Sequence, residues 1–215
     1  MLFADTVLKK FDGAERYNMD TGIAFAAVTT RNEGVRVTGK LGFSGHPMIE
    51  HFNYVAAHTR RMPKMTIPAP SAIYGRPVMT PIDKTAYPDR EQFFDDLGQA
   101  YRKAVRSFAD AGCRYLQLDE VNFTYLCYPK LRAFVADRGE NPDELPHIYA
   151  GVINAALSDL PAGVTKAMHL CRGNFQSTFV ASGGYEPVAE ILFNEVAIDA
   201  YFMEYDSARA GGFEP

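Results

Sequence analysis

Cysteine is scarce in this 215-residue chain, which has only Cys113, Cys127 and Cys171. A sparse, odd number of cysteines argues against a disulfide framework and fits a reducing compartment. Apolar runs are also short, and none approaches the ~20 residues that a membrane span requires. Residues 1–10 lack the basic-then-apolar order of a signal peptide. These absences predict a cytoplasmic protein that does not span a membrane.

Basic charge is not in excess, because 22 Lys and Arg residues face 26 Asp and Glu residues, giving a net charge of -4. No basic stripe indicates a nucleic-acid partner, and no basic amphipathic helix indicates a membrane surface. No glycine-rich phosphate loop of the Rossmann or P-loop kind follows an expected strand. The remaining composition, 47 % hydrophobic, is that of an ordinary globular protein, and we expect residues 1–215 to form a single domain.

Expected strands alternate with expected helices along most of the chain. The most regular helix is expected to begin after Asp89, an N-cap, and to end at Gly112, with an apolar stripe between them. Residues 1–32 are weakly patterned, with one short helical face that includes Leu8 and Phe11. The expected strands are 35–41, 64–67, 114–118, the run that carries His169, and 197–203.

Such alternation predicts parallel βαβ units and an α/β fold. Because no nucleotide-binding loop is present, we favour the (β/α)8 TIM-barrel type over an open sheet. Five expected strands are fewer than eight, and a complete barrel usually takes about 250 residues. We therefore expect an incomplete barrel, with about five of the eight strands present.

Ligands of parallel α/β proteins bind at the carboxyl ends of the strands. Polar side chains gather at the expected strand ends, namely Ser71, Asp119, Glu120, His169, Cys171, Glu204 and Asp206. In an extended strand, His169 and Cys171 would lie on one face, about 6.5 Å apart. A zinc ion, bound at roughly 2.0 Å by nitrogen and 2.3 Å by sulfur, can bridge that gap. Two ligands alone do not make a site, so a buried His and Cys without a metal is the alternative.

Five stretches, in this order and spacing, resemble the catalytic C-terminal barrel of the cobalamin-independent methionine synthase family. They are K-M-T-I-P-A-P-S (64–71), G-C-R-Y-L-Q-L-D-E (112–120), H-L-C-R-G-N (169–174), S-G-G-Y-E-P (182–187) and Y-F-M-E-Y-D (201–206). The resemblance is closest to short bacterial relatives that consist of this barrel alone, and it covers most of the chain from about residue 39. It implies two further strands before Val35 and one after Pro215.

The resemblance implies a catalytic zinc ion held by His169, Cys171 and Glu204. The family's fourth ligand, a Cys near the last strand, has no counterpart in this sequence. Cys113 precedes its strand and should lie at the opposite end of the barrel, whereas Cys127 lies in a loop after a strand end. For Glu204, the alternative is a carboxylate paired with an arginine such as Arg209.

The L-D-E motif of the family implies that Asp119 contacts the amino group of homocysteine. Its neighbour Glu120 should point to the opposite face of the strand, so only one of the two can face the barrel mouth directly. Either carboxylate can instead cap the next turn. Ser71 is a candidate for the pocket lining, and the alternative for it is a simple turn residue.

The implied activity is that of a 5-methyltetrahydropteroyltriglutamate–homocysteine S-methyltransferase-like enzyme. Such an enzyme transfers a methyl group from a methyltetrahydrofolate-like donor to the thiol of homocysteine. A free thiol with a pKa near 8.5 is mostly protonated at neutral pH, and binding to zinc deprotonates it. The barrel-only relatives lack the domain that helps to bind the donor, so a methylated corrinoid or another small methyl compound is an open alternative.

Two other functions remain open from the sequence. A metal-free barrel of the uroporphyrinogen decarboxylase type would need clustered arginines at its mouth, and only Arg172 lies near a strand end. A non-catalytic fragment would need a partner chain to supply the missing strands, which would make the protein a homo-oligomer or part of a larger assembly.

Overall fold

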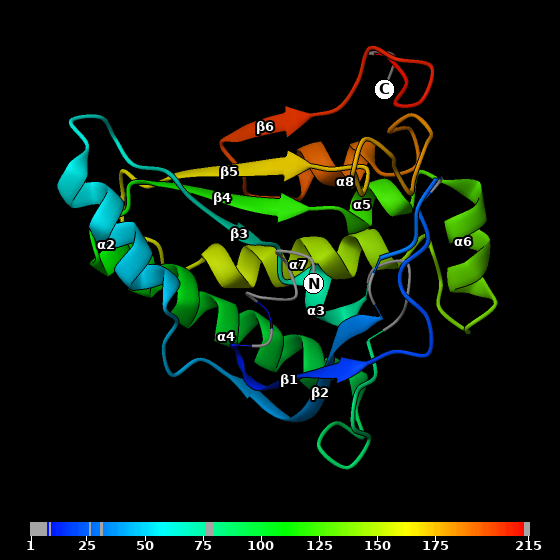
Figure 1. Ribbon diagram of the computed structural model, residues 1–215, viewed down its shortest axis with the longest axis horizontal. Coiled ribbons are helices and arrows are strands. Elements are labelled where there is room, and N and C mark those ends of the chain that lie inside the picture. Colours follow the sequence, from blue (N-terminus) through cyan, green and yellow to red (C-terminus); the bar gives the residue numbers. More distant parts are fainter. Residues whose placement is uncertain (1–7, 9, 26, 31, 76–79, 213–215) are drawn as a thin grey trace.

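The computed structural model describes residues 8, 10–25, 27–30, 32–75 and 80–212. Four parallel strands form its main sheet, in the order β3-β4-β5-β6, so that neighbours in the sheet are consecutive along the chain (Figure 1). Their bounds are Met65–Pro68, Tyr115–Glu120, Thr165–Leu170 and Ala200–Met203. The predicted TIM-barrel-type α/β fold is confirmed as an incomplete barrel, and the described residues do not close a ring.

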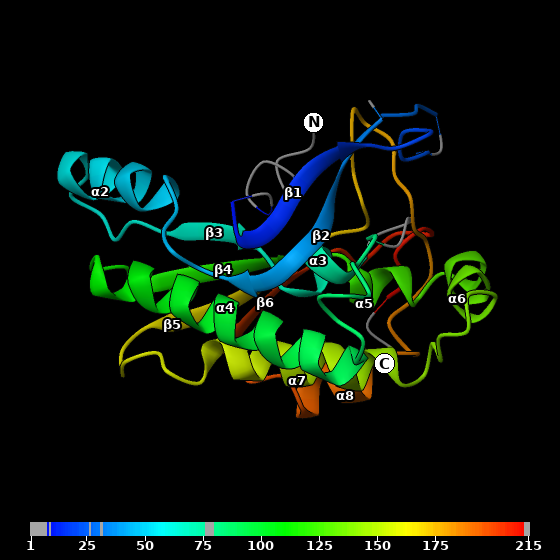
Figure 2. The ribbon, with the colours of Figure 1, turned by 90° about the horizontal axis from the view of Figure 1, so that it is seen from below.

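Three helices connect these strands and lie together on one side of them, namely α4 (Arg90–Asp110), α7 (Leu145–Leu157) and α8 (Ala189–Asn194) (Figure 2). Alternate strand residues face these helices and are fully buried, as Leu118 and Leu170 are. The predicted N-cap of α4 is confirmed, because the Asp89 side chain accepts a hydrogen bond from the backbone N–H of Glu91 at 2.9 Å. The opposite face of the sheet is free of these helices.

The strand predicted at 35–41 exists as β2 (Glu33–Gly42), but it does not join the parallel sheet. It pairs antiparallel with β1 (Asp12–Asn18), a strand that the sequence pattern did not predict. This hairpin packs against α4, where the Phe11 ring stacks on Tyr101 with centroids 4.6 Å apart. The parallel sheet therefore contains four of the five expected strands.

Four further helices lie in the described chain, namely α2 (Met48–His58), α3 (Ser71–Tyr74), α5 (Asn122–Tyr125) and α6 (Pro129–Ala136). Helix α2 projects from the body and buries only Phe52 (Figure 2). Part of the short helical face expected near Leu8 lies outside the described residues, and its described members Leu8 and Phe11 are buried in the core. No helix within the described residues is both long and apolar enough to cross a membrane.

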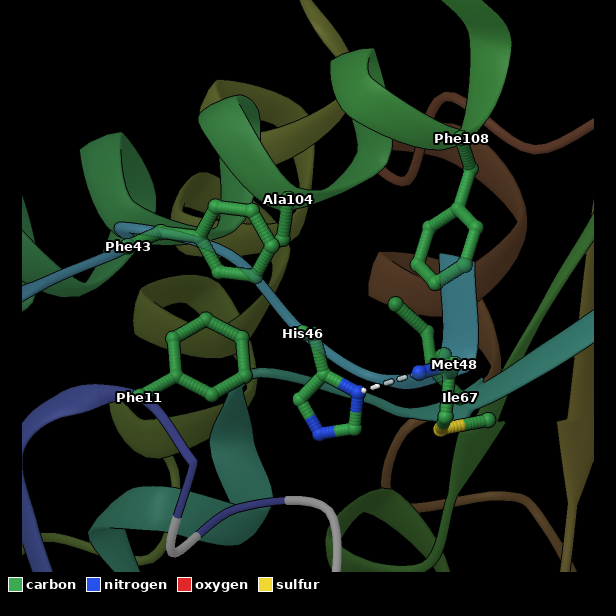
Figure 3. A pocket seen from close by; sticks show the side chains of 7 residues that line it. All are labelled: Phe11, Phe43, His46, Met48, Ile67, Ala104 and Phe108. Carbon is green, nitrogen blue, oxygen red and sulfur yellow. Dashed lines mark hydrogen bonds between the residues drawn. The ribbon is translucent and has the colours of Figure 1, made fainter. Parts of the chain in front are cut away.

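A small hollow, about 210 Å³ including its open mouth, lies between the hairpin side and α4 (Figure 3). Its lining is mainly apolar, with Phe11, Phe43, Ile67 and Phe108 among the side chains. The one polar ring, His46, accepts a hydrogen bond at Nδ1 from the backbone N–H of Met48 at 3.0 Å. None of the lining residues is a predicted site residue, so the chemistry of the strand ends lies elsewhere.

Candidate metal centre

The strand register brings Asp119 and His169 side by side. Asp119 of β4 pairs with His169 of β5, and His169 pairs with Phe202 of β6. Paired residues of parallel strands point to the same face, and here that face is the one opposite the helices. A half-buried carboxyl group and an imidazole therefore meet at the carboxyl ends of two neighbouring strands.

His169, Cys171 and Glu204 converge at this edge, with their ligand atoms all within 4.8 Å of one another. Cys171 is the first residue after β5, and Glu204 is the first residue after β6. Within the described part of the chain, this is the one group of three or more His, Cys, Asp and Glu side chains that could hold a metal ion. The three residues singled out by the sequence are thus brought together.

The imidazole of His169 is held in one orientation by β6. Its Nδ1 lies 3.0 Å from the carbonyl oxygen of Phe202, and because a carbonyl only accepts, Nδ1 must donate. Nε2 is then left to face the cluster, in the arrangement that metal-binding histidines adopt when a carbonyl holds their other nitrogen. A hydrogen bond with Cys171 is the main cause of a raised pKa for His169.

The sulfur of Cys171 is surrounded by hydrogen-bond donors. The backbone N–H of Gly173 lies 3.3 Å from Sγ and the side-chain amide of Asn174 lies 3.7 Å from it. Burial acts to raise the pKa of the Cys171 thiol, but the hydrogen bonds from His169 and from the following loop outweigh it, and the pKa is lowered. Such an environment favours the thiolate, which is the form that binds metals.

The carboxylate of Glu204 has three hydrogen-bond partners besides the cluster, one of which is the backbone N–H of Arg172 at 3.4 Å. Arg209 donates to one oxygen at 2.8 Å, and the side-chain amide of Asn174 donates to the other. Arg209 also donates to the amide oxygen of Asn174 at 2.8 Å, which closes a triangle of three side chains. The pairing with Arg209 that was the alternative for Glu204 is therefore present, in the same carboxylate that faces His169 and Cys171.

The donor set fits a zinc ion. One imidazole nitrogen, one thiolate and one carboxylate are ligands that zinc accepts, and three protein ligands leave a fourth position open for substrate. Tetrahedral zinc requires its ligand atoms to lie within about 3.8 Å of one another. The side chains would therefore have to draw together by up to about 1 Å, which rotamer adjustments can supply.

The other two cysteines do not join this group. Cys113 lies before β4 and is buried at the opposite end of the sheet, where Sγ donates to the carbonyl of Tyr115 at 3.3 Å. Cys127 is buried after α5, with its Sγ 3.5 Å from the carbonyl of Phe123, and burial raises its pKa to about 11. Neither thiol takes the place of a fourth ligand.

Asp119 lies beside the cluster and is positioned by residues that the sequence did not reveal. Its carboxylate accepts a hydrogen bond from the side-chain amide of Gln117 at 2.7 Å, and Gln117 accepts one from Lys64 at 2.9 Å. Burial raises the pKa of Asp119, although the Gln117 hydrogen bond and the charges of His169 and Lys64 act against it. The half-buried carboxylate of Asp119 can contact a cationic group that approaches the candidate metal centre.

Glu120 and Ser71 lie on the other face of the sheet, where they contact each other. Glu120 is fully buried, and its carboxylate accepts hydrogen bonds from the Ser71 hydroxyl and from the backbone N–H of Asn122. Burial raises the pKa of Glu120, against the effect of these bonds. In this conformation the pair links the ends of β3 and β4 and presents no surface to a ligand, so a substrate contact by either residue stays a prediction.

We expect Ser71→Ala to destabilise the fold by about 2 kcal/mol at pH 8, because the hydroxyl stabilises the charged form of Glu120. The loss should be smaller at pH 5. A carboxyl group with a raised folded pKa destabilises the fold as the pH rises above its unfolded pKa, and removal of the hydroxyl strengthens this effect. Urea denaturation at both pH values measures it.

Ser107→Ala is the matched control, because the Ser107 hydroxyl donates to an uncharged carbonyl, that of Ala104, at 2.7 Å. Its cost should be the same at pH 5 and pH 8. A cost of Ser71→Ala that is equal at the two pH values, or larger at pH 5, would show that the hydroxyl does not stabilise a charged Glu120.

Arg172, which follows Cys171, is fully buried and ties the surrounding loops together. Its guanidinium donates to the carbonyls of Gly183 at 2.5 Å and Ala210 at 2.9 Å and lies 4.4 Å from the centroid of the Tyr185 ring. Gly183 has a φ of 124°, and a side chain there would collide with the carbonyl of Cys127. A glycine is thus required at position 183 by the backbone conformation and by the close packing against Cys127.

The turn between β1 and β2 reaches the loop that follows the cluster. The backbone N–H of Ala27 donates to the Thr178 hydroxyl at 3.1 Å, and the rings of Phe25 and Phe175 lie 5.4 Å apart. The N-terminal region, which lies before the stretches that resemble the methionine synthase family, therefore supports the loop beside the candidate metal centre.

No protein-family profile matches the chain. Two uncharacterized Bacillus subtilis proteins, YxjH and YxjG, are each 41 % identical to it, over 209 and 210 residues. Each alignment includes 97 % of this chain and 55 % of the relative. The chain thus spans about half the length of the curated relatives it matches.

Two solved structures share the fold. A Listeria monocytogenes protein, provisionally assigned as a vitamin-B12-independent methionine synthase, superposes with a TM-score of 0.70 at 34 % identity, over 95 % of this chain and 54 % of that one. A B12-independent methionine synthase from a Shewanella species, solved in complex with selenomethionine, superposes with a TM-score of 0.66 at 15 % identity, over 93 % of this chain and 53 % of that one. The second likeness concerns the fold alone. The chain is thus similar to about half of a protein of the B12-independent methionine synthase kind.

Proposed function

We propose that the chain is the catalytic portion of a cobalamin-independent methionine synthase-type enzyme, which methylates the thiol of homocysteine in a zinc-dependent reaction. The observation that carries the proposal is the convergence of His169, Cys171 and Glu204 within 4.8 Å at adjoining strand ends. The likeness to the Listeria protein supports the same reaction class. The three unpaired cysteines agree with a cytoplasmic enzyme.

Each residue has a defined part in this proposal. A bound zinc ion would act as a Lewis acid that favours the thiolate form of the substrate. His169 presents Nε2 because the Phe202 carbonyl holds Nδ1, and the N–H donors of the loop favour the thiolate form of Cys171. Asp119 would bind the substrate ammonium group. The thiol sulfur then forms a bond to the methyl carbon, and the bond from that carbon to the donor breaks. With a methyltetrahydrofolate donor, the leaving nitrogen takes up one proton for the one that the thiol gives up, so that the reaction balances.

Ser71 and Glu120 would act indirectly, by holding the end of β4 that carries Asp119. The methyl donor is proposed to be a methyltetrahydrofolate, with a methylated corrinoid as the alternative. The decarboxylase alternative loses its one supporting arginine, because the Arg172 guanidinium is fully buried among loop carbonyls. A homo-oligomer that completes the barrel stays a prediction.

The direct test is formation of methionine from homocysteine and methyltetrahydrofolate by the zinc-loaded chain, followed by mass spectrometry. We expect Asp119→Asn to lower kcat/KM by about 100-fold, mainly through KM, because it removes a charged partner of the substrate ammonium group. Asp95→Asn, an identical change at an exposed position of α4, should leave both constants unchanged. Bound zinc without any methyl transfer from either donor would contradict the proposed reaction.

A further inference from the structure

Arg209 shares a carboxylate with the candidate metal centre. Its guanidinium donates to Glu204 at 2.8 Å, while Glu204 also belongs to the group formed with His169 and Cys171. The two side chains are half-buried, with 29 % of Arg209 and 21 % of Glu204 exposed. An arginine is always charged at physiological pH, so a permanent cation lies next to one of the three groups that would bind a metal.

The position of Arg209 is built into the fold. Its own carbonyl accepts a hydrogen bond from the backbone N–H of Gly183 at 2.8 Å, and the next carbonyl, that of Ala210, is bound by the buried Arg172. Its guanidinium lies 4.7 Å from the centroid of the Phe179 ring and donates to the amide oxygen of Asn174 at 2.8 Å. The backbone, ring and amide contacts together fix the position of Arg209 beside Glu204, so their interaction is more constrained than an isolated ion pair on the surface.

The geometry of the cluster agrees with competition between Arg209 and a metal ion for the carboxylate of Glu204. The ligand atoms lie within 4.8 Å of one another, whereas tetrahedral zinc requires about 3.8 Å or less. Among the three side chains, Glu204 is the one that a charged group outside the cluster holds. Arg209 donates to its Oε2, and Asn174 donates to its Oε1. Drawing the ligands together would weaken the contact between Glu204 and Arg209.

We infer that Arg209 is a built-in competitor of the metal, a cation that neutralises Glu204 when no metal is bound and lowers the affinity of the site for a divalent ion. The inference rests on the proposed metal site and extends it to a residue that sets its affinity. Two cations repel each other across one carboxylate, and the repulsion is large in a half-buried site because water screens it poorly. Arg209 would therefore keep the metal exchangeable.

Zinc affinity, measured by competition with a chromophoric chelator on the full chain, tests this inference. Arg209→Met keeps the length of the side chain and removes its charge, and we expect it to tighten zinc binding by about tenfold. Arg209→Lys keeps the charge and should bind zinc as the wild type does. In a Glu204→Gln background, Arg209→Met should have a smaller effect, because the competition for the carboxylate is gone and only the direct repulsion between the two cations remains.

Asn174→Ala is the comparison variant, because it removes a neutral hydrogen bond from the same carboxylate while the charge of Arg209 stays. Asn174 also accepts a hydrogen bond from Arg209 and contacts the Cys171 sulfur, so any tightening should be well below that of Arg209→Met. Thermal melting of each variant without metal confirms that it is folded. If the wild type binds zinc and Arg209→Met binds it equally well or more weakly, the inference is overturned while the metal site stands. Equal tightening by Asn174→Ala would also overturn it, because charge would not then be the cause. Absence of zinc binding in the wild type and in Arg209→Met would overturn both the metal site and the inference.

Discussion

Replacement of His169 by alanine is expected to weaken zinc binding by at least about 100-fold, because it removes one of the three ligands proposed for the metal. The effect should exceed the 10–100-fold that is typical of losing an outer hydrogen-bond partner of a ligand. The orientation of His169 is also defined, since the Phe202 carbonyl holds its Nδ1. Competition titration with a chromophoric chelator gives the affinity.

His147→Ala is the control for this experiment. His147 lies on α7, exposed, with its Nδ1 2.9 Å from the carboxylate of Glu195, and it is remote from the cluster in the chain and in the fold. Its loss should leave zinc affinity unchanged. If the two variants bind zinc equally well, the metal is held somewhere other than at the end of β5.

Arg172→Met is expected to lower the free energy of unfolding by about 3 kcal/mol. The substitution leaves the carbonyls of Gly183 and Ala210 without their donor in a buried setting, and each unpaired group costs roughly 1–3 kcal/mol. It also removes the cation from the face of the Tyr185 ring. Release of the guanidinium from burial offsets part of this cost. Urea denaturation followed by circular dichroism measures the change.

Arg138→Met provides the comparison, because Arg138 also lies over an aromatic ring, 4.2 Å from the centroid of Phe134, but is exposed on the surface. Its loss should cost less than about 1 kcal/mol. Equal, small effects of the two substitutions would mean that Arg172 does not organise the loops around the cluster. A large effect at position 172 alone would agree with its role as their anchor.

The parallel strands and the pair of His169 and Cys171 followed from local patterns, whereas Glu204 as a third ligand was implied by the family resemblance. Strand and helix periods predicted β3 to β6 and α4, and the spacing of His169 and Cys171 at a strand end indicated a pair of ligands. Alternation along β4 correctly placed Asp119 and Glu120 on opposite faces, since Asp119 lies beside His169 and Glu120 is buried toward the helices. These features depend on neighbours within a few residues, which is why sequence alone reveals them.

Features that depend on contacts distant in the sequence were not predicted. Strand β1 lies within residues 1–32, whose sequence pattern is weak, and the partner that stabilises it lies in residues 33–42. The hydrogen bonds from Lys64 through Gln117 to Asp119 cross two strands and leave no local pattern. The burial of Arg172 arises from loops up to 38 residues away, and charge alone suggested an exposed position.

The most direct test of the metal site is the zinc content per chain. Elemental analysis would measure it in the purified wild type and in the Cys171→Ser and Cys113→Ala variants. We predict about one zinc ion in the wild type, little in Cys171→Ser and about one in Cys113→Ala, whose thiol lies at the opposite end of the sheet. No zinc in the wild type, or equal zinc in the wild type and Cys171→Ser, would contradict a metal centre formed by His169, Cys171 and Glu204.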